Sequence, residues 1–263
     1  MPTADQTSNS ASNQGRRRTR PSRFFTELVI VVVGALIVSS LLRAFVGQMF
    51  IIPSGSMENT LQIDDRVAVQ KITDFHRGDV VVFEDPGGWL GPEEETKPEP
   101  DPFGQALEFI GLAPAASDHL IKRVIGMPGD RVICCDKLGR LTVNGVALDE
   151  TRYVYTSAGD GEQDAPSEIE FDVTVPEGRI FVMGDHRAAS ADSRCHLSDV
   201  SLHGPEGSVA FVPIDKVVGP AFAIVLPFNR LTALQRPPIF DLVPDPSGPA
   251  PKEAVIKPKG VTC

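Results

Sequence analysis

The feature that most constrains the fold is an apolar run from about Phe24 to Phe45, close to the N-terminus. Its centre, Leu28 to Leu42, contains no charged residue, and Arg43 near its end can extend its side chain toward lipid headgroups. About 20 apolar residues in a helix are enough to cross a bilayer. The sequence therefore predicts one transmembrane helix over residues 24–46.

The charges on the two sides of this run differ in sign. Residues 1–23 hold five arginines and one aspartate, a net charge of +4, so the remainder carries −14 of the total of −10. Arginine beside an apolar span is retained on the cytoplasmic side. We therefore expect residues 1–23 to be a disordered cytoplasmic tail. The body would lie outside the cell membrane in a single-pass topology, with the lipid bilayer as a partner and no nucleic acid bound.

Two other interpretations of the run stay open. A cleavable signal peptide would have a shorter apolar region and would end in a small-x-small site, which residues 43–47 match poorly. A buried helix of a soluble domain fits poorly with the arginines and with the Ser-, Asn- and Gln-rich leader before them.

Beyond residue 50 the chain consists of short β-type runs between Gly/Pro turns, which predicts a mostly β, antiparallel architecture. An Asn144-Gly145 pair is a strong signal for a hairpin turn. The expected strands cover residues 66–72, 79–83, 121–125, 131–134, 141–143, 179–183, 209–212 and 217–226.

Three segments interrupt or follow this pattern. Residues 84–118 are Pro/Glu-rich and predict a surface insertion, with a short helix over 103–112, and residues 157–170 form an acidic loop. Eight of the 23 prolines fall after residue 226, so residues 227–263 are expected to be an extended, partly disordered tail.

The four cysteines do not have the spacing of a zinc site. A disulfide is possible outside the membrane, and we prefer Cys195 with Cys134 or Cys135, because a bond between the two adjacent cysteines would be strained.

A serine turn and a lysine contain the side chains that could take part in a reaction. Residues 52–57, Ile-Pro-Ser-Gly-Ser-Met, form a Pro-containing turn that can present a hydroxyl directly behind the apolar run. A serine needs a base to become a nucleophile. Lys122 lies in an apolar β-run on the same face as Leu120 and Val124, where burial would lower its pKa and allow a neutral amine to act as base.

Four segments in this order resemble those of type I signal peptidases, membrane-anchored Ser/Lys peptidases of the S26 family that remove secretory signal peptides. The resemblance covers roughly residues 24–225. Its blocks are residues 52–61, 77–83, 121–130 and 184–194. It implies an antiparallel β-sheet catalytic domain over residues 47–226, with a second β-rich cap region, preceded by one N-terminal transmembrane helix.

The resemblance also implies roles for individual residues. Ser56 would be the nucleophile and Lys122 the general base. The backbone N–H of Ser56 and the hydroxyl of Ser54 would stabilise the oxyanion. Ser190 would orient the Lys122 amine by a hydrogen bond, and the remaining two residues, Asp192 and Arg194, would form an ion pair that supports this loop.

Substrate selection would follow from shallow apolar pockets that accept alanine and exclude larger side chains. By resemblance, they would be lined by Phe50, Ile52, Met57 and Ile121. The expected partners are signal peptides of exported preproteins, cleaved after small-x-small sites, and the translocation machinery is a further candidate. No metal or organic cofactor is implied.

The chain departs from the family pattern at three places. Asn59 replaces a usual proline, His186 a common asparagine, and Ala188-Ala189 replace polar residues. Three other functions stay open: a Ser-His-Asp hydrolase using one of His186, His196 and His203; a self-cleaving repressor, which would need a DNA-binding module; and a membrane-tethered binding protein.

Overall fold

The computed structural model describes residues 23–45, 47–91, 119–200 and 204–257. The helix expected near the N-terminus is present as α1 (Arg23–Phe45), and its large aliphatic side chains between Leu28 and Val38 are exposed. Within the described ranges, no helix combines the length and the apolar character that a membrane span requires.

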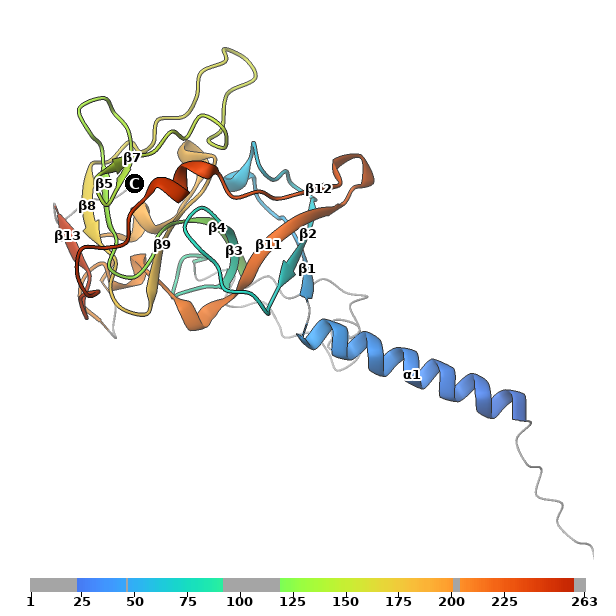
Figure 1. The fold of residues 1–263 in the computed structure, drawn as a ribbon. Helices are drawn as coiled ribbons and strands as arrows, with labels where there is room; N and C mark the ends of the chain where they lie inside the picture. The colour runs from blue at the N-terminus through green and yellow to red at the C-terminus, as the bar shows by residue number, and fades with distance from the viewer. Residues whose placement is uncertain (1–22, 46, 92–118, 201–203, 258–263) are drawn as a thin grey trace, which may run out of the picture. The chain divides into compact units, whose positions relative to one another are not determined.

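The larger β-sheet has the strand order β1-β2-β11-β3-β4-β9-β10, with β12 paired to β11, and every pairing is antiparallel (Figure 1). Strand β11, although late in the chain, lies between β2 and β3. The strands are β1 (Gly47–Ile51), β2 (Arg66–Gln70), β3 (Val80–Glu84), β4 (His119–Gly126), β9 (Arg179–Met183), β10 (Val212–Pro213), β11 (Val217–Leu226) and β12 (Thr232–Ala233).

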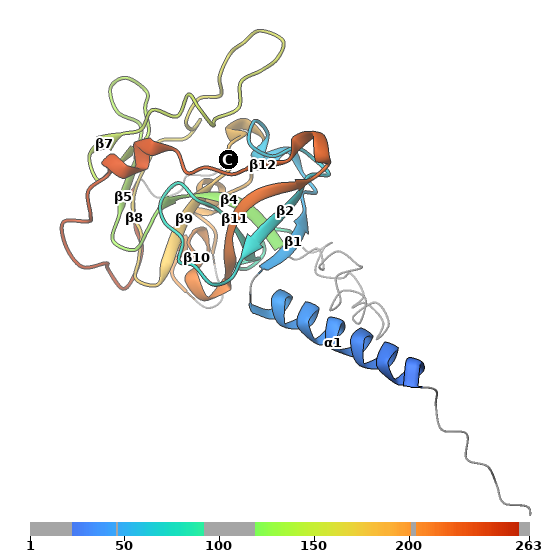
Figure 2. The ribbon, with the colours of Figure 1, turned by 45° about the vertical axis from the view of Figure 1, so that its right-hand side comes forward.

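A second antiparallel sheet has the order β13-β8-β5-β6-β7 and lies on the side of the β unit away from β1 and β2 (Figures 1 and 2). The predicted Asn144-Gly145 turn joins β6 to β7, and both residues have the positive φ that a two-residue hairpin turn needs. The strands are β5 (Arg131–Cys134), β6 (Thr142–Val143), β7 (Val146–Ala147), β8 (Phe171–Thr174) and β13 (Val255–Lys257). The predicted mostly antiparallel β fold is confirmed.

Short 3-10 helices join these strands and carry several residues of the site. They are η1 (Gly55–Met57), η2 (Arg187–Ala189), η3 (Ser193–His196), η4 (Ser208–Ala210), η5 (Ile214–Lys216), η6 (Phe228–Arg230) and η7 (Pro238–Leu242). The strand expected over 209–212 is instead the end of η4 followed by the two-residue strand β10. Gly207, with φ of 75°, turns the chain before this helix, so the apolar run begins in a helical turn.

The apolar run of β3 is buried on both faces of the larger sheet. Val80 and Val82 pack in one hydrophobic cluster, whereas Val81 and Phe83 pack in another. Successive side chains of a strand point to opposite faces, so a continuous apolar run belongs to a strand covered on both sides. Lys122 lies opposite Val81 in the adjoining strand β4, inside this covered region.

The C-terminal segment corrects the expectation of an extended, partly disordered tail over 227–263. Phe240 and Val243 are buried in the main hydrophobic cluster, and β13 adds a strand to the second sheet. Arg230 makes two hydrogen bonds to the carboxylate of Asp65, at 2.8 and 2.9 Å. Proline-rich sequence is extended but not necessarily unpacked, because apolar residues between the prolines can still enter a core.

The predicted insertion over 84–118 is described only at its two ends. Trp89 packs edge-on against Phe83, and its indole N–H donates to the Val209 carbonyl at 3.0 Å. The helix expected over 103–112 lies outside the described residues.

Candidate active site

Ser56 lies in η1, directly behind the first strand of the larger sheet. Backbone pairing between β1 and β2 continues past the end of β1, because the N–H of Ile52 donates to the carbonyl of Asp65, the residue before β2, at 2.9 Å. The turn then closes through a hydrogen bond from the Glu58 N–H to the Gly55 carbonyl, also at 2.9 Å. Ser56 is only 7% exposed, so its hydroxyl faces the protein and not open solvent.

Lys122 of β4 meets this hydroxyl. A hydrogen bond of 2.6 Å joins Lys122 Nζ to Ser56 Oγ. Burial lowers the pKa of Lys122 from its usual 10.5 to about 8, while the carboxylates of Asp192 and Asp185 oppose the fall. Because burial disfavours the ammonium form, a useful fraction of the amine is neutral near physiological pH. The structure thus brings together a serine and a base able to accept its proton.

Asp192 organises the third segment of the site. Its buried carboxylate accepts hydrogen bonds from the Gly184 N–H at 2.9 Å, from Ser190 Oγ at 2.8 Å and from the Arg194 guanidinium at 2.8 Å. Burial alone would raise its pKa, but the charge and hydrogen bonds of Arg194 hold the pKa below its usual value. Asp192 is therefore a fixed negative charge that also raises the pKa of Lys122.

The hydrogen bond expected between Ser190 and Lys122 is not among the contacts of the described residues. The Ser190 hydroxyl instead donates to Asp192, which is the stronger acceptor because it is charged. Ser190 thus acts on Lys122 indirectly. It binds Asp192, and the charge of Asp192 raises the pKa of the Lys122 amine.

Gly184 lets the serine turn and the Ser190 segment approach each other. A Cβ built on Gly184 would lie 2.5 Å from the Ser56 carbonyl oxygen and would also overlap the side chain of Ser190. Such distances are too short for any real Cβ, so the close approach depends on the absence of a side chain here.

A buried ion pair supports the same place from β4. Arg123 donates to the carboxylate of Asp185 at 2.6 and 2.8 Å and to the Gly78 carbonyl at 2.6 Å, and the Thr60 hydroxyl donates to Asp185. Arg123 neighbours Lys122, and Thr60 follows the serine turn. This pair therefore ties β4, the serine turn and the segment after β9 together.

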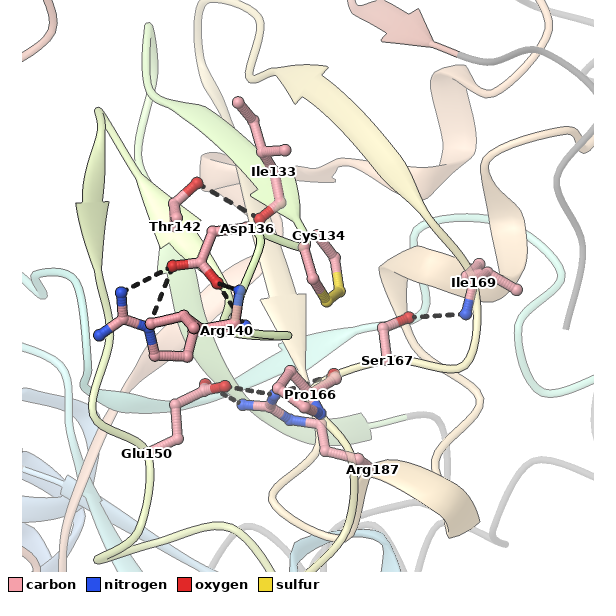
Figure 3. Close-up of a disulfide and its surroundings, with 12 residues drawn as sticks. Ile133, Cys134, Asp136, Arg140, Thr142, Glu150, Pro166, Ser167, Ile169 and Arg187 are labelled. Carbon is pink, nitrogen blue, oxygen red and sulfur yellow. Dashed lines mark hydrogen bonds and ion pairs between the residues drawn. A yellow bond between two sulfur atoms is a disulfide. The ribbon is translucent and has the colours of Figure 1, made fainter.

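A second buried ion pair joins Arg187, which lies in the last block of the family resemblance, to Glu150, which sequence analysis did not single out. Arg187 donates to Glu150 at 2.6 and 3.1 Å and to the Pro166 carbonyl at 3.0 Å (Figure 3). Tyr153 donates to Glu150 at 2.7 Å, and the Arg123 guanidinium lies 4.5 Å above its ring. Glu150 and Tyr153 belong to an irregular segment, where no periodic pattern could have revealed their role.

Ser54 lies beside Ser56 on the exposed side of the turn. Its Oγ donates to Ser56 Oγ at a long 3.4 Å, and its side chain makes no capping hydrogen bond to η1. A purely turn-forming hydroxyl would be expected to make such a bond. Its position leaves this hydroxyl available to a group bound at Ser56.

The four residues predicted to contact substrate are brought together in one hydrophobic cluster: Phe50, Ile52, Met57 and Ile121. Phe50 and Ile121 keep a small exposed area, whereas Ile52 and Met57 have almost none. These residues come from β1, the serine turn and β4, and together they form an apolar cluster next to Ser56.

Among the described contacts, neither His186 nor His196 places its imidazole against Ser56. The imidazole of His186 faces Glu58 and Asp164, and only its backbone N–H reaches Ser56, at the carbonyl oxygen. His196 pairs with Asp199 and stacks on Trp89. His203 lies outside the described residues.

Comparison with known proteins identifies the family of the chain. The sequence profile of the family described as "Signal peptidase, peptidase S26" matches residues 25–226. The chain belongs to this family. It is 36% identical over 228 residues to the signal peptidase I of Mycobacterium tuberculosis, covering 80% of this chain and 76% of that protein. A probable signal peptidase I of Mycobacterium leprae is 36% identical over 226 residues, covering 78% and 76%. A probable signal peptidase I-2 of Synechocystis is 33% identical over 223 residues, covering 83% and 81%.

This S26 peptidase accommodates the unusual Asn59 in its serine turn. Asn59 has φ of 82°, a left-handed conformation that proline, with its fixed negative φ, cannot adopt. The side chain donates to the Val154 carbonyl at 3.3 Å, and the turn is closed by the Leu61 N–H on the Met57 carbonyl at 2.7 Å. The turn is therefore held by other bonds in place of proline.

The disulfide expectation for this peptidase is wrong. Cys134 bonds to Cys135, at the point where β5 ends (Figure 3), and not to Cys195. Cys195 lies in η3, where its sulfur contacts the Ser190 carbonyl beside the third segment of the site. Cys134 is the last residue of β5 in the second sheet, so Cys134 and Cys195 belong to different parts of the fold.

Proposed function

We propose that this member of the signal peptidase family is a serine endopeptidase in which neutral Lys122 activates Ser56. The observation that carries the proposal is the 2.6 Å contact between Lys122 Nζ and Ser56 Oγ, made by an amine whose burial lowers its pKa to about 8. A lysine of ordinary pKa would be almost wholly protonated at pH 7 and unable to accept a proton.

The reaction would run in two stages. Lys122 takes the Ser56 proton as Oγ attacks the scissile carbonyl, and the ammonium then gives that proton to the departing amine. Water, deprotonated by the same amine, next attacks the acyl-enzyme, and the ammonium returns that proton to Ser56 Oγ as the bond to the acyl group breaks. During each attack the Ser56 N–H and the Ser54 hydroxyl would donate to the oxyanion. One such donor typically contributes about 2.7–4 kcal/mol to lowering the barrier.

We propose that the substrates are signal peptides of exported preproteins, cleaved after small-x-small sites. The apolar cluster of Phe50, Ile52, Met57 and Ile121 beside Ser56 supports a preference for small side chains, because these residues are themselves buried and expose little apolar surface to a larger group. An extended substrate would pair with exposed strand edges next to the serine turn.

The deciding experiment compares Ser56→Ala and Lys122→Ala on one preprotein, with the exposed Ser247→Ala and Lys252→Ala as surface controls. Removing either member of a serine–base pair typically lowers kcat by about 10⁴-fold or more. We expect that loss for the two site variants and wild-type turnover for the controls. A Lys122→Ala enzyme that keeps near-normal turnover while His186→Ala is inactive would favour a Ser-His hydrolase instead.

We also propose that the apolar segment over 24–46 anchors the protein in the cell membrane, with the N-terminus in the cytoplasm. Exposed aliphatic side chains of α1 and the arginines before it support contact with lipid and this orientation. The substrate would then be met as it leaves the translocation machinery. Protease added outside spheroplasts should digest the catalytic domain, and protection of that domain would overturn the orientation.

A further inference from the structure

His186 occupies a position between three parts of the site that are distant in sequence. Its backbone N–H donates to the carbonyl of Ser56 at 3.1 Å, and its imidazole stacks on the ring of Tyr155 with centroids 3.9 Å apart. Its Nδ1 lies 3.0 Å from the Glu58 carboxylate, and its Nε2 lies 3.9 Å from Asp164. The side chain is 17% exposed, so these contacts are largely shielded from solvent.

Glu58 connects this imidazole to the nucleophile turn. Its carboxylate folds back over Gly55, where an added Cβ would lie 3.1–3.3 Å from the carboxylate atoms. Gly55 stands between the two serines of the turn. The position of the Glu58 carboxylate is therefore coupled to the backbone that carries Ser56.

Asp164 connects the imidazole to the acidic loop. Its carboxylate also accepts from the Ala188 N–H at 3.1 Å, in the helix η2 that leads to Ser190. The Tyr155 N–H donates to the Asp185 carbonyl at 2.8 Å, so the loop is held on both sides of His186. Two carboxylates of different segments thus flank one ring, while Nδ1 is buried without a well-aligned hydrogen bond among the described residues.

We propose that His186 is a positioning residue of the Ser56 turn, acting through its contacts with Glu58 and Asp164. The ring ties the acidic loop to the turn, and its own N–H fixes the Ser56 carbonyl, which sets the direction of Oγ toward Lys122. A misplacement of about 1 Å in a reacting group can lower the rate by about 10²-fold, so even a partial loosening is measurable. This inference rests on the proposed Ser56–Lys122 chemistry.

The test uses variants that keep the packing and remove the polar contacts. His186→Phe preserves a ring against Tyr155 but has no nitrogen to face the carboxylates. Glu58→Gln keeps the size of a side chain that is 36% exposed and removes its charge. His196→Phe is the matched control, because His196 also pairs with a carboxylate and stacks on an aromatic ring, but has no described contact with Ser56 or Lys122.

We expect His186→Phe and Glu58→Gln each to lower kcat about tenfold on the full-length enzyme, with KM changed less than twofold. The double variant should be no slower than the slower single variant, because both remove one connection. His196→Phe should keep wild-type kcat. The acid limb of the pH profile should keep its midpoint, since the surroundings of Lys122 are unchanged.

Three results would overturn the positioning role: kcat within twofold of wild type in both single variants, a rise in KM with kcat unchanged, or multiplicative losses in the double variant. Only variants whose Tm lies within about 2 °C of the wild-type Tm are compared, because these proteins are folded. If Lys122→Ala were active, the proposed chemistry itself would fail, and that outcome is distinct from any obtained with the His186 series.

Discussion

The pH dependence of catalysis follows directly from the burial of Lys122. Its pKa is lowered to about 8, and the neutral amine is the form that can accept the Ser56 proton. Below that pKa, the neutral fraction falls about tenfold for each pH unit, to roughly one tenth at pH 7 and one hundredth at pH 6. We expect kcat/KM to follow this fraction and to level off above pH 8.

The assay is the steady-state cleavage of a quenched peptide with an Ala-x-Ala site by detergent-solubilised enzyme between pH 5.5 and 9.5. Lys122→Arg is the control, because a guanidinium keeps the charge but does not lose a proton in this range. It should be inactive at every pH. Asp192→Asn adds a test of the cause, since the Asp192 charge raises the pKa of Lys122. Its removal should move the acid limb to lower pH, even though the plateau falls.

A profile that stays flat down to pH 5.5 would refute the neutral-lysine reasoning. So would a limb that moves to higher pH in Asp192→Asn, because the carboxylate would then not be stabilising the ammonium. Both outcomes are visible without knowing the absolute rate.

Three further predictions concern single residues. Lys122→Met should make the folded protein more stable at pH 7 by up to about 3 kcal/mol in urea unfolding, less the lost Ser56 contact, because the native pKa of about 8 lies below the unfolded 10.5. The wild-type stability should accordingly rise between pH 8 and 10.5, where the unfolded state binds more protons, and the variant should lack this rise. Gly184→Ala should lower kcat by about 10²-fold while unfolding changes by about 1–3 kcal/mol, as judged by kinetics and thermal melting. Ser54→Ala should lower kcat by about 10²–10³-fold with little change in KM, and a loss under threefold would exclude its oxyanion role.

Much of the fold could be predicted because its signals are local. Alternation and turn residues located β2, β4, β5, β9 and β11 to within a few residues, and the Asn144-Gly145 turn is where it was expected. The order of strands could not be derived in this way, because no local pattern specifies that β11 separates β2 from β3. The packing of Phe240 also escaped prediction, since composition describes a segment's average and not the contact of one side chain.

The site was predictable only where residues fall in compact blocks. Ser56 and Lys122 lie in such blocks, and the fold brings them to 2.6 Å. The Glu150–Arg187 pair joins an irregular segment to a short helix, and the partner of Ser190 depends on the competition between one carboxylate and one amine. Which partner a side chain binds depends on the three-dimensional arrangement. The sequence could therefore identify these residues but not their hydrogen-bond and ion-pair partners.

The central place of β11 has a consequence for when the enzyme becomes active. Strand β11 joins β1 and β2, the strands nearest to Ser56, to β3 and to β4, and β4 carries Lys122. During synthesis, β11 emerges long after both Ser56 and Lys122. We therefore expect a nascent chain that has not reached residue 217 to lack the strand that joins the two halves of the site. Under the proposed Ser56–Lys122 chemistry, activity would then appear only when nearly the whole region matched to the family, residues 25–226, is available for folding.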